Sequence, residues 1–153
     1  MNDMEIDRLA RLSFKRYRQH CEKEGISFKY SNFDDQPQTL IDSCIAQVKS
    51  IDRKLDALNM YAHPADPVNH NRVLSFTAEE IESLAIQEHD RWVAERIADG
   101  WILGPEVDAV SKTTPDLVPW EELTEVEKDF DRRPIKDIIP LLESIGYWVY
   151  RLY

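Results

Sequence analysis

The 153-residue chain is poor in glycine and cysteine, with four and two respectively, and it contains no long hydrophobic run. With so few glycines it has no glycine-rich loop of the kind that cradles phosphates in nucleotide hydrolases. Cys21 and Cys44 fall in helical patterns, which predicts free thiols in a reducing cytoplasm and not a disulfide framework. No run of about 18 apolar residues is present, so we expect no transmembrane helix and no membrane partner.

Motifs that carry catalysis or bind metal are also missing. The cysteines and histidines lack the spacing of a zinc site, and no nucleophile elbow is present. Residues 1–6 lack the basic and apolar regions of a secretory signal. We therefore expect no catalytic residue, no metal and no cofactor, in a protein that works in the cytoplasm.

The charge is strongly negative overall but unevenly distributed. A net charge of -10 argues against nucleic-acid binding, which depends on neutralising phosphates. Residues 8–23 are nevertheless mostly basic, whereas residues 121–131 are mostly acidic. A basic helix in an acidic protein is a candidate anion site, and a solvated helix face is the alternative interpretation.

Helical patterns cover most of the chain. Apolar residues that recur with a period of 3.6, and glycines that can end helices, predict helices over 4–24, 40–58, 77–99 and 134–145, with a short helix from Thr124. Residues 101–123 form a loop too long to be passive, so we expect it to be ordered. A short extended segment, residues 147–153, ends a chain whose expected fold class is all-α.

The most informative stretch lies between residues 88 and 132. It contains Glu88-His89-Asp90-Arg91-Trp92, then Gly100-Trp101-Ile102-Leu103-Gly104, then a segment from Lys112 to Leu123 that includes Leu117-Val118-Pro119-Trp120. In order and spacing this pattern resembles the RyR domain, a small α-helical module of ryanodine-receptor channels and of bacterial and phage proteins. The resemblance covers about residues 77–150, and Thr114 departs from it where the family often has histidine.

The first half of the chain resembles a degenerate second copy of this pattern. At an ungapped offset of 75 residues Tyr17 falls on Trp92, and at an offset of 87 Phe33 falls on Trp120. Chance similarity between amphipathic helices is the alternative. The predicted organisation is a first RyR-like repeat in 1–60, a linker in 61–76 and a second repeat in 77–153. The two helix-pair repeats would be related by a pseudo-twofold in one compact unit.

One face of the helix predicted over 77–99 carries an unusual set of side chains. Glu88, His89, Trp92 and Arg96 lie within about one face by three- and four-residue spacing. Glutamate is rarely buried without a partner, so these groups either contact a ligand or bond the backbone of the long loop.

The resemblance also implies a ligand site. In tandem RyR domains an aromatic residue of this helix in each copy is thought to clamp a nucleotide base, which points to Tyr17 and Trp92 here. Two facing aromatic planes suit a flat base. Basic groups near the cleft would meet phosphates, and Ser13 and Trp101 complete the expected ligand-binding set, Trp101 also anchoring the loop. The basic candidates are Arg16, Arg91, Arg96 and Lys112.

The function that this resemblance implies is non-enzymatic binding of a nucleotide-derived small molecule. An ADP-ribose-type or cyclic nucleotide signal, such as cyclic ADP-ribose, is expected, because bacterial members are associated with nucleotide signalling and defence. The protein would act as a sensor or as a sequestering protein, and a homodimer is a candidate assembly. The alternatives are a structural protein–protein interaction module and an enzyme that acts on a nucleotide signal.

Overall fold

The computed structural model describes residues 1–153 without a gap. They form two compact units, the first made of Met1–Phe76 with Asp137–Tyr153 and the second of Thr77–Lys136. The long helix α5, Glu125–Glu143, contributes residues to both. None of the helices has the length and the apolar composition that a membrane-spanning segment needs.

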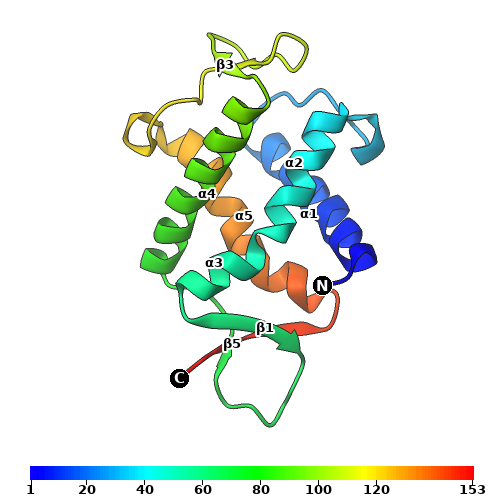
Figure 1. The fold of residues 1–153 in the computed structure, drawn as a ribbon, viewed down its shortest axis with the longest axis vertical. Coiled ribbons are helices and arrows are strands. Elements are labelled where there is room, and N and C mark those ends of the chain that lie inside the picture. The colour runs from blue at the N-terminus through cyan, green and yellow to red at the C-terminus, as the bar shows by residue number, and fades with distance from the viewer. The chain divides into compact units, whose positions relative to one another are not determined.

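The first unit combines helices with a small sheet (Figure 1). An Asn2 capping box opens α1, and its apolar face buries residues such as Leu9 and Phe14. α3 leads directly into the strand β1 beside it. The elements are α1 (Asp3–Lys23), the 3₁₀ turn η1 (Phe33–Asp35), α2 (Gln38–Lys49), α3 (Ile51–Ala57), β1 (Met60–Pro64), β2 (Arg72–Val73), the end of α5, and β5 (Tyr147–Arg151).

This sheet shows that the all-α prediction is wrong. The chain is 56% helical and 11% strand, which makes it a mixed α/β fold. β5 lies between β1 and β2 and pairs antiparallel with both. The expected extended segment is a strand because its aromatic and β-branched residues favour a pleated surface. Its partner β1 could not be found from the sequence, because Met60-Tyr61-Ala62-His63-Pro64 lacks an alternating pattern and the pairing is non-local.

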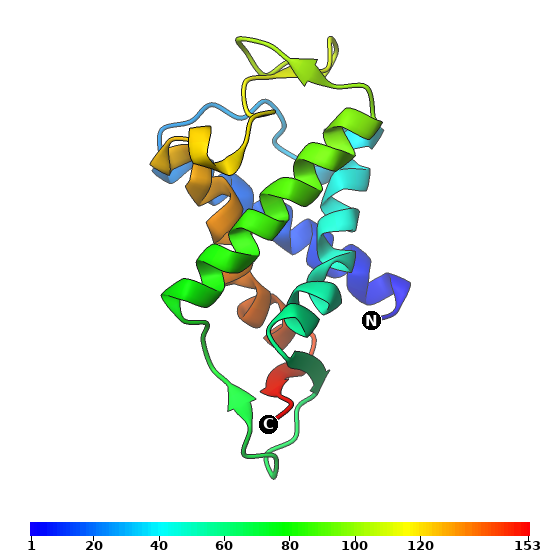
Figure 2. The same cartoon turned by 60° about the vertical axis from the view of Figure 1, so that its left-hand side comes forward.

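The second unit contains α4 (Ala78–Ala98), β3 (Ile102–Leu103), β4 (Thr113–Thr114), η2 (Trp120–Glu122) and the first part of α5. A Thr77 capping box opens α4, at the residue where the sequence predicted the helix to begin. β3 and β4 pair in parallel and form a small lobe beyond the C-terminal end of α4 (Figure 2). This parallel pair is a second departure from the all-α prediction. α5 runs continuously through Pro134, where the sequence had suggested a helix start.

Equivalent elements recur along the chain at the two expected offsets. α1 and α4 each have 21 residues, a capping box and a left-handed glycine after the last turn, Gly25 and Gly100. The bonds that close the two helices also match, since Ile26 N donates to Cys21 O and Trp101 N donates to Arg96 O. In the second half of each repeat the offset is 87 residues. With this offset the first residues of η1, α2 and β1 correspond to the first residues of η2, α5 and β5.

The pairing of β1 with β5 has a local twofold character. Ala62 pairs with Val149, its own equivalent at the 87-residue offset, while Met60 pairs with Arg151 and Pro64 with Tyr147. Two copies of one segment that pair about a twofold axis produce this reciprocal register. An internal repeat explains this register and the matching elements. The domain boundaries at 60 and 77 stay a prediction.

A matched pair of left-handed residues allows a test of this equivalence. Asn59, with φ 56°, precedes β1, and Gly146, with φ 82°, precedes β5. A Cβ at Gly146 would meet no atom within 4 Å, so only backbone strain opposes substitution there. We expect Gly146→Asn to change the free energy of unfolding little, because asparagine tolerates this region, and Gly146→Val to lower it by about 1–2 kcal/mol or more.

Urea denaturation of these variants measures the difference. Asn59→Gly and Asn59→Val form the matched set at the equivalent position, and they should rank in the same order. An equal loss for valine and asparagine at Gly146 would contradict the assignment of the cost to backbone strain.

Candidate functional site

The candidate site is built around α4, whose middle turns carry buried polar side chains. Glu88 and His89 are only 1% and 2% exposed, and Arg96 is also buried. Trp92, on the same stripe, is partly exposed. The helix therefore carries one partly exposed aromatic ring beside polar and charged side chains that contact other protein groups.

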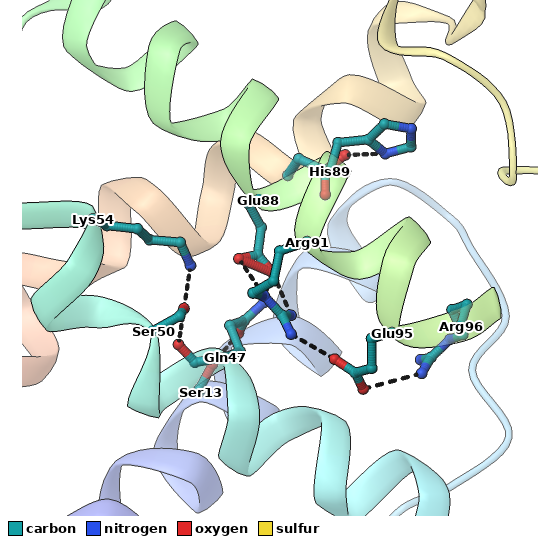
Figure 3. Close-up of polar contacts among 10 residues, drawn as sticks. Ser13, Gln47, Ser50, Lys54, Glu88, His89, Arg91, Glu95 and Arg96 are labelled. Carbon is teal, nitrogen blue, oxygen red and sulfur yellow. Dashed lines mark hydrogen bonds and ion pairs between the residues drawn. The ribbon is translucent and has the colours of Figure 1, made fainter. Parts of the chain in front are cut away.

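Arg91 is held by two carboxylates of its own helix (Figure 3). Its Nε lies 3.1 Å from both oxygens of Glu88, one terminal nitrogen lies 2.6 Å from Glu88, and the other contacts Glu95. Burial lowers the pKa of Arg91, but the bonds to Glu88 and Glu95 outweigh it and raise the pKa. Arg91 is thus a permanent cation, each of whose three nitrogens already has a carboxylate acceptor, and its part in phosphate binding stays a prediction.

His89 joins α4 to two other parts of the second unit. Its Nε2 lies 2.6 Å from the carbonyl oxygen of Val118 in the long loop, and its Nδ1 lies 3.2 Å from Asp131 on α5. Burial lowers the pKa of His89, but the bonds to Asp131 and Val118 outweigh it and raise the pKa. The interpretation that His89 holds the long loop therefore agrees with its contacts.

Trp92 lies beside His89 and Arg96. The His89 ring stacks on it with centroids 6.0 Å apart and planes 23° apart, and Arg96 Cζ lies 5.2 Å from its centroid. Arg96 also lies 4.9 Å from the centroid of Trp101, so one guanidinium contacts two indoles. Trp101 is buried, and its Nε1 donates to Asp99 over 3.1 Å. The arrangement places an aromatic plane beside the Arg96 guanidinium, which also lies 3.5 Å from the Glu95 carboxylate.

Lys112 links the β3–β4 lobe to the C-terminal end of α4 through hydrogen bonds. It adopts a left-handed backbone conformation, and its Nζ lies 2.8 Å from the carbonyl oxygen of Asp99 and 3.3 Å from the Asp99 carboxylate. A lysine at this place satisfies the end of the helix, where carbonyl groups lack partners and the helix dipole is negative.

The other predicted residues belong to α1 in the first unit. Tyr17 is partly exposed, and its ring meets Phe28 edge-on at 4.9 Å. Arg16 forms an ion pair with Asp137 at 2.9 Å, and Ser13 lies 3.4 Å from Gln47. The structure thus groups seven predicted residues in the second unit and three in the first. The facing of Tyr17 and Trp92 stays a prediction.

Several polar partners were missed by the sequence analysis. Glu95 could have been found, because it lies four residues after Arg91 on the helix. The sequence could not indicate Asp131 as the partner of His89, because the two residues lie far apart in the chain. The same holds for the pairing of Asp116 with Glu127. Burial and the hydrogen bond to Glu127 raise the pKa of Asp116 to about 7.

The chain matches the model of a known protein family. The model of the RyR domain matches residues 64–151, more than half of the chain. The matched range includes all of α4, the β3–β4 lobe, α5 and β5. No group of three or more histidine, cysteine, aspartate or glutamate side chains is placed to hold a metal ion.

Proposed function

Because the chain belongs to the RyR domain family, we propose that it binds a nucleotide-derived small molecule, of the ADP-ribose or cyclic nucleotide type. The observation that supports this proposal is the partly exposed Trp92 ring beside His89 and Arg96. A nucleotide presents a flat base and negative charge together, and this part of α4 presents their complements. The protein would serve as a sensor or as a sequestering protein.

The chemistry of recognition divides between the base and the phosphates. Stacking of a base on Trp92 contributes about 1–3 kcal/mol. Arg96 is fixed between indoles, so little side-chain entropy is lost when it meets a phosphate. Tyr17 supplies the second plane in this proposal, because α1 and α4 are equivalent in length, cap and ending. The clamp requires the two rings to lie about 7 Å apart, one contact distance on each side of the base.

We expect the ligand to be released unchanged. Glu88 bonds Arg91, and His89 bonds Val118 and Asp131, so neither side chain is poised to exchange a proton with a ligand. Mass spectrometry of the nucleotide after long incubation with substoichiometric protein checks this. Hydrolysed or transferred products would instead favour an enzyme.

A thermal-shift panel of ATP, NAD, ADP-ribose and cyclic ADP-ribose tests the proposal at its simplest. A ligand at about 100 times its dissociation constant adds about 2.7 kcal/mol to the stability of the native state, which gives a visible shift. We expect at least one member to raise the melting temperature. If none does at millimolar concentration, the ligand class is wrong.

An interaction module is the second candidate function, supported by the β3–β4 lobe. Ile102, Leu103, Val107 and Val110 of this lobe are 59–85% exposed. Several exposed aliphatic side chains in one small lobe are a feature that protein contacts use. A homodimer is one such assembly, and light scattering of the wild type beside Leu103→Asp would detect it. A monomer at all concentrations would remove that candidate.

A further inference from the structure

The hydrogen bonds of His89 require two protons on its ring. Val118 offers a carbonyl oxygen to Nε2 and Asp131 offers a carboxylate oxygen to Nδ1. Both partners accept and neither can donate, whereas a neutral imidazole has only one N–H. Both bonds therefore form together only when His89 is an imidazolium.

A second proton is shared by two carboxyl groups near Val118. The carboxyl groups of Asp116 and Glu127 hydrogen-bond each other. Two carboxylates can do so only if one keeps its proton, and half-buried Asp116 is the one that keeps it, because the Glu127 carboxylate is stabilised by a hydrogen bond from the backbone N–H of Thr124. Asp116 and Val118 are two residues apart, so both protons fasten one segment.

We infer that residues 115–123, here called the strap, are held against α4 and α5 by two protons, one on His89 and one shared by Asp116 and Glu127, and that loss of these protons releases the strap. This regulatory device is independent of any ligand. It concerns the segment between the β3–β4 lobe and the start of α5, in which Trp120 and Leu123 are buried.

The charges around these groups determine the direction of the effect. His89 is surrounded by acids, from Asp90 on α4, Asp131 and Glu127 on α5 and Asp116 in the strap. Lys128 and Arg132 lie over the Trp120 ring, and Arg132 is bound to Glu82, Glu125 and Asp129. Without the two protons, three carboxylates would meet beside a neutral imidazole.

Attachment of the strap therefore weakens as the pH rises. The pKa of Asp116 is raised from 3.8 to about 7, so its contribution is complete below 3.8 and is lost between these values. The pKa of His89 is raised from 6.5, so its contribution is complete below 6.5 and is lost as the pH passes through the raised pKa. The loss of strap attachment comes mainly from Asp116 below neutral pH and mainly from His89 above it.

Hydrogen exchange of the strap amides in the full chain without ligand tests this inference. After correction for intrinsic exchange rates, we expect the protection factors of residues 116–123 to fall about tenfold or more between pH 5.5 and 8.5, because each pKa unit corresponds to a factor of ten. α1, which carries none of these groups, is the internal control and should change much less. Equal strap protection at both pH values would overturn the inference.

Two variants separate the protons. Asp116→Asn keeps a donor for Glu127 without a titrating proton, so the fall below pH 7 should disappear while the fall above it stays. His89→Gln should reduce protection at the lower pH values, where the wild-type ring carries its second proton, and should remove the upper part of the response. If His89→Gln fails to fold, the ¹⁵N shifts of the wild-type ring decide, since both nitrogens must be protonated at pH 6. A single protonated nitrogen there contradicts the inference.

Discussion

Replacement of Arg91 by methionine is expected to lower the free energy of unfolding by about 3–5 kcal/mol, because it removes the bidentate partner of a carboxylate that is 1% exposed. Methionine keeps much of the volume of the arginine side chain, so the lost stability is due to the missing charge and not to a cavity. Chemical denaturation followed by circular dichroism measures it. A loss below about 1 kcal/mol would show that Arg91 does not stabilise Glu88 in solution.

A double-mutant cycle isolates the pair. Glu88→Gln removes the carboxylate, so the Glu88→Gln/Arg91→Met double variant should lose less than the sum of the single variants, by about 0.5–3 kcal/mol. Arg11→Met is the matched control, because Arg11 also pairs with two carboxylates, Asp7 and Asp34, but at an exposed position. It should lose far less than Arg91→Met.

The second large effect concerns ligand affinity. Trp92→Ala and Tyr17→Ala should each weaken nucleotide binding about 5- to 150-fold, because each removes one stacking face worth about 1–3 kcal/mol. Tyr17→Trp keeps an aromatic plane and makes the first helix more like the second, so it should bind as well as the wild type or better. Normal binding by both alanine variants would direct the search to the loop of residues 101–123.

Trp120→Ala separates affinity from stability in this series. Trp120 is buried, and His89 meets its ring edge-on at 6.1 Å. We expect this variant to lose about 3–5 kcal/mol of stability. The Trp92 and Tyr17 variants should keep most of their ligand-free melting temperature. A Trp92→Ala variant as unstable as Trp120→Ala would make Trp92 a packing residue.

The helix α4 could be predicted from the sequence because its start and stop signals are local. Thr77 with Glu80 marks the start of α4 and Gly100 its end, and both features fall within one helical turn of the boundary that they specify. The RyR pattern was equally readable, since Glu88, His89 and Trp92 are close in the sequence. Its family assignment is confirmed by the match over residues 64–151.

The sheet and the polar partners could not be predicted, because they depend on segments far apart in the chain. β1 becomes a strand only because β5, about 87 residues later, provides its hydrogen bonds. His89 could be identified as a candidate, but its two acceptors lie 29 and 42 residues away. No local pattern indicates which carboxylate will face a histidine. The charge state of His89 could therefore be inferred only from the folded structure.

Isothermal titration calorimetry of the wild type, Tyr17→Ala and Trp92→Ala with the panel nucleotide that gives the largest thermal shift tests the central claim most directly. Nucleotide binding by a two-aromatic clamp predicts a stoichiometry of one ligand per chain for the wild type, and at least fivefold weaker binding for each variant at unchanged ligand-free stability. No measurable heat for any panel member with the wild type, or equal affinities for all three proteins, would contradict it.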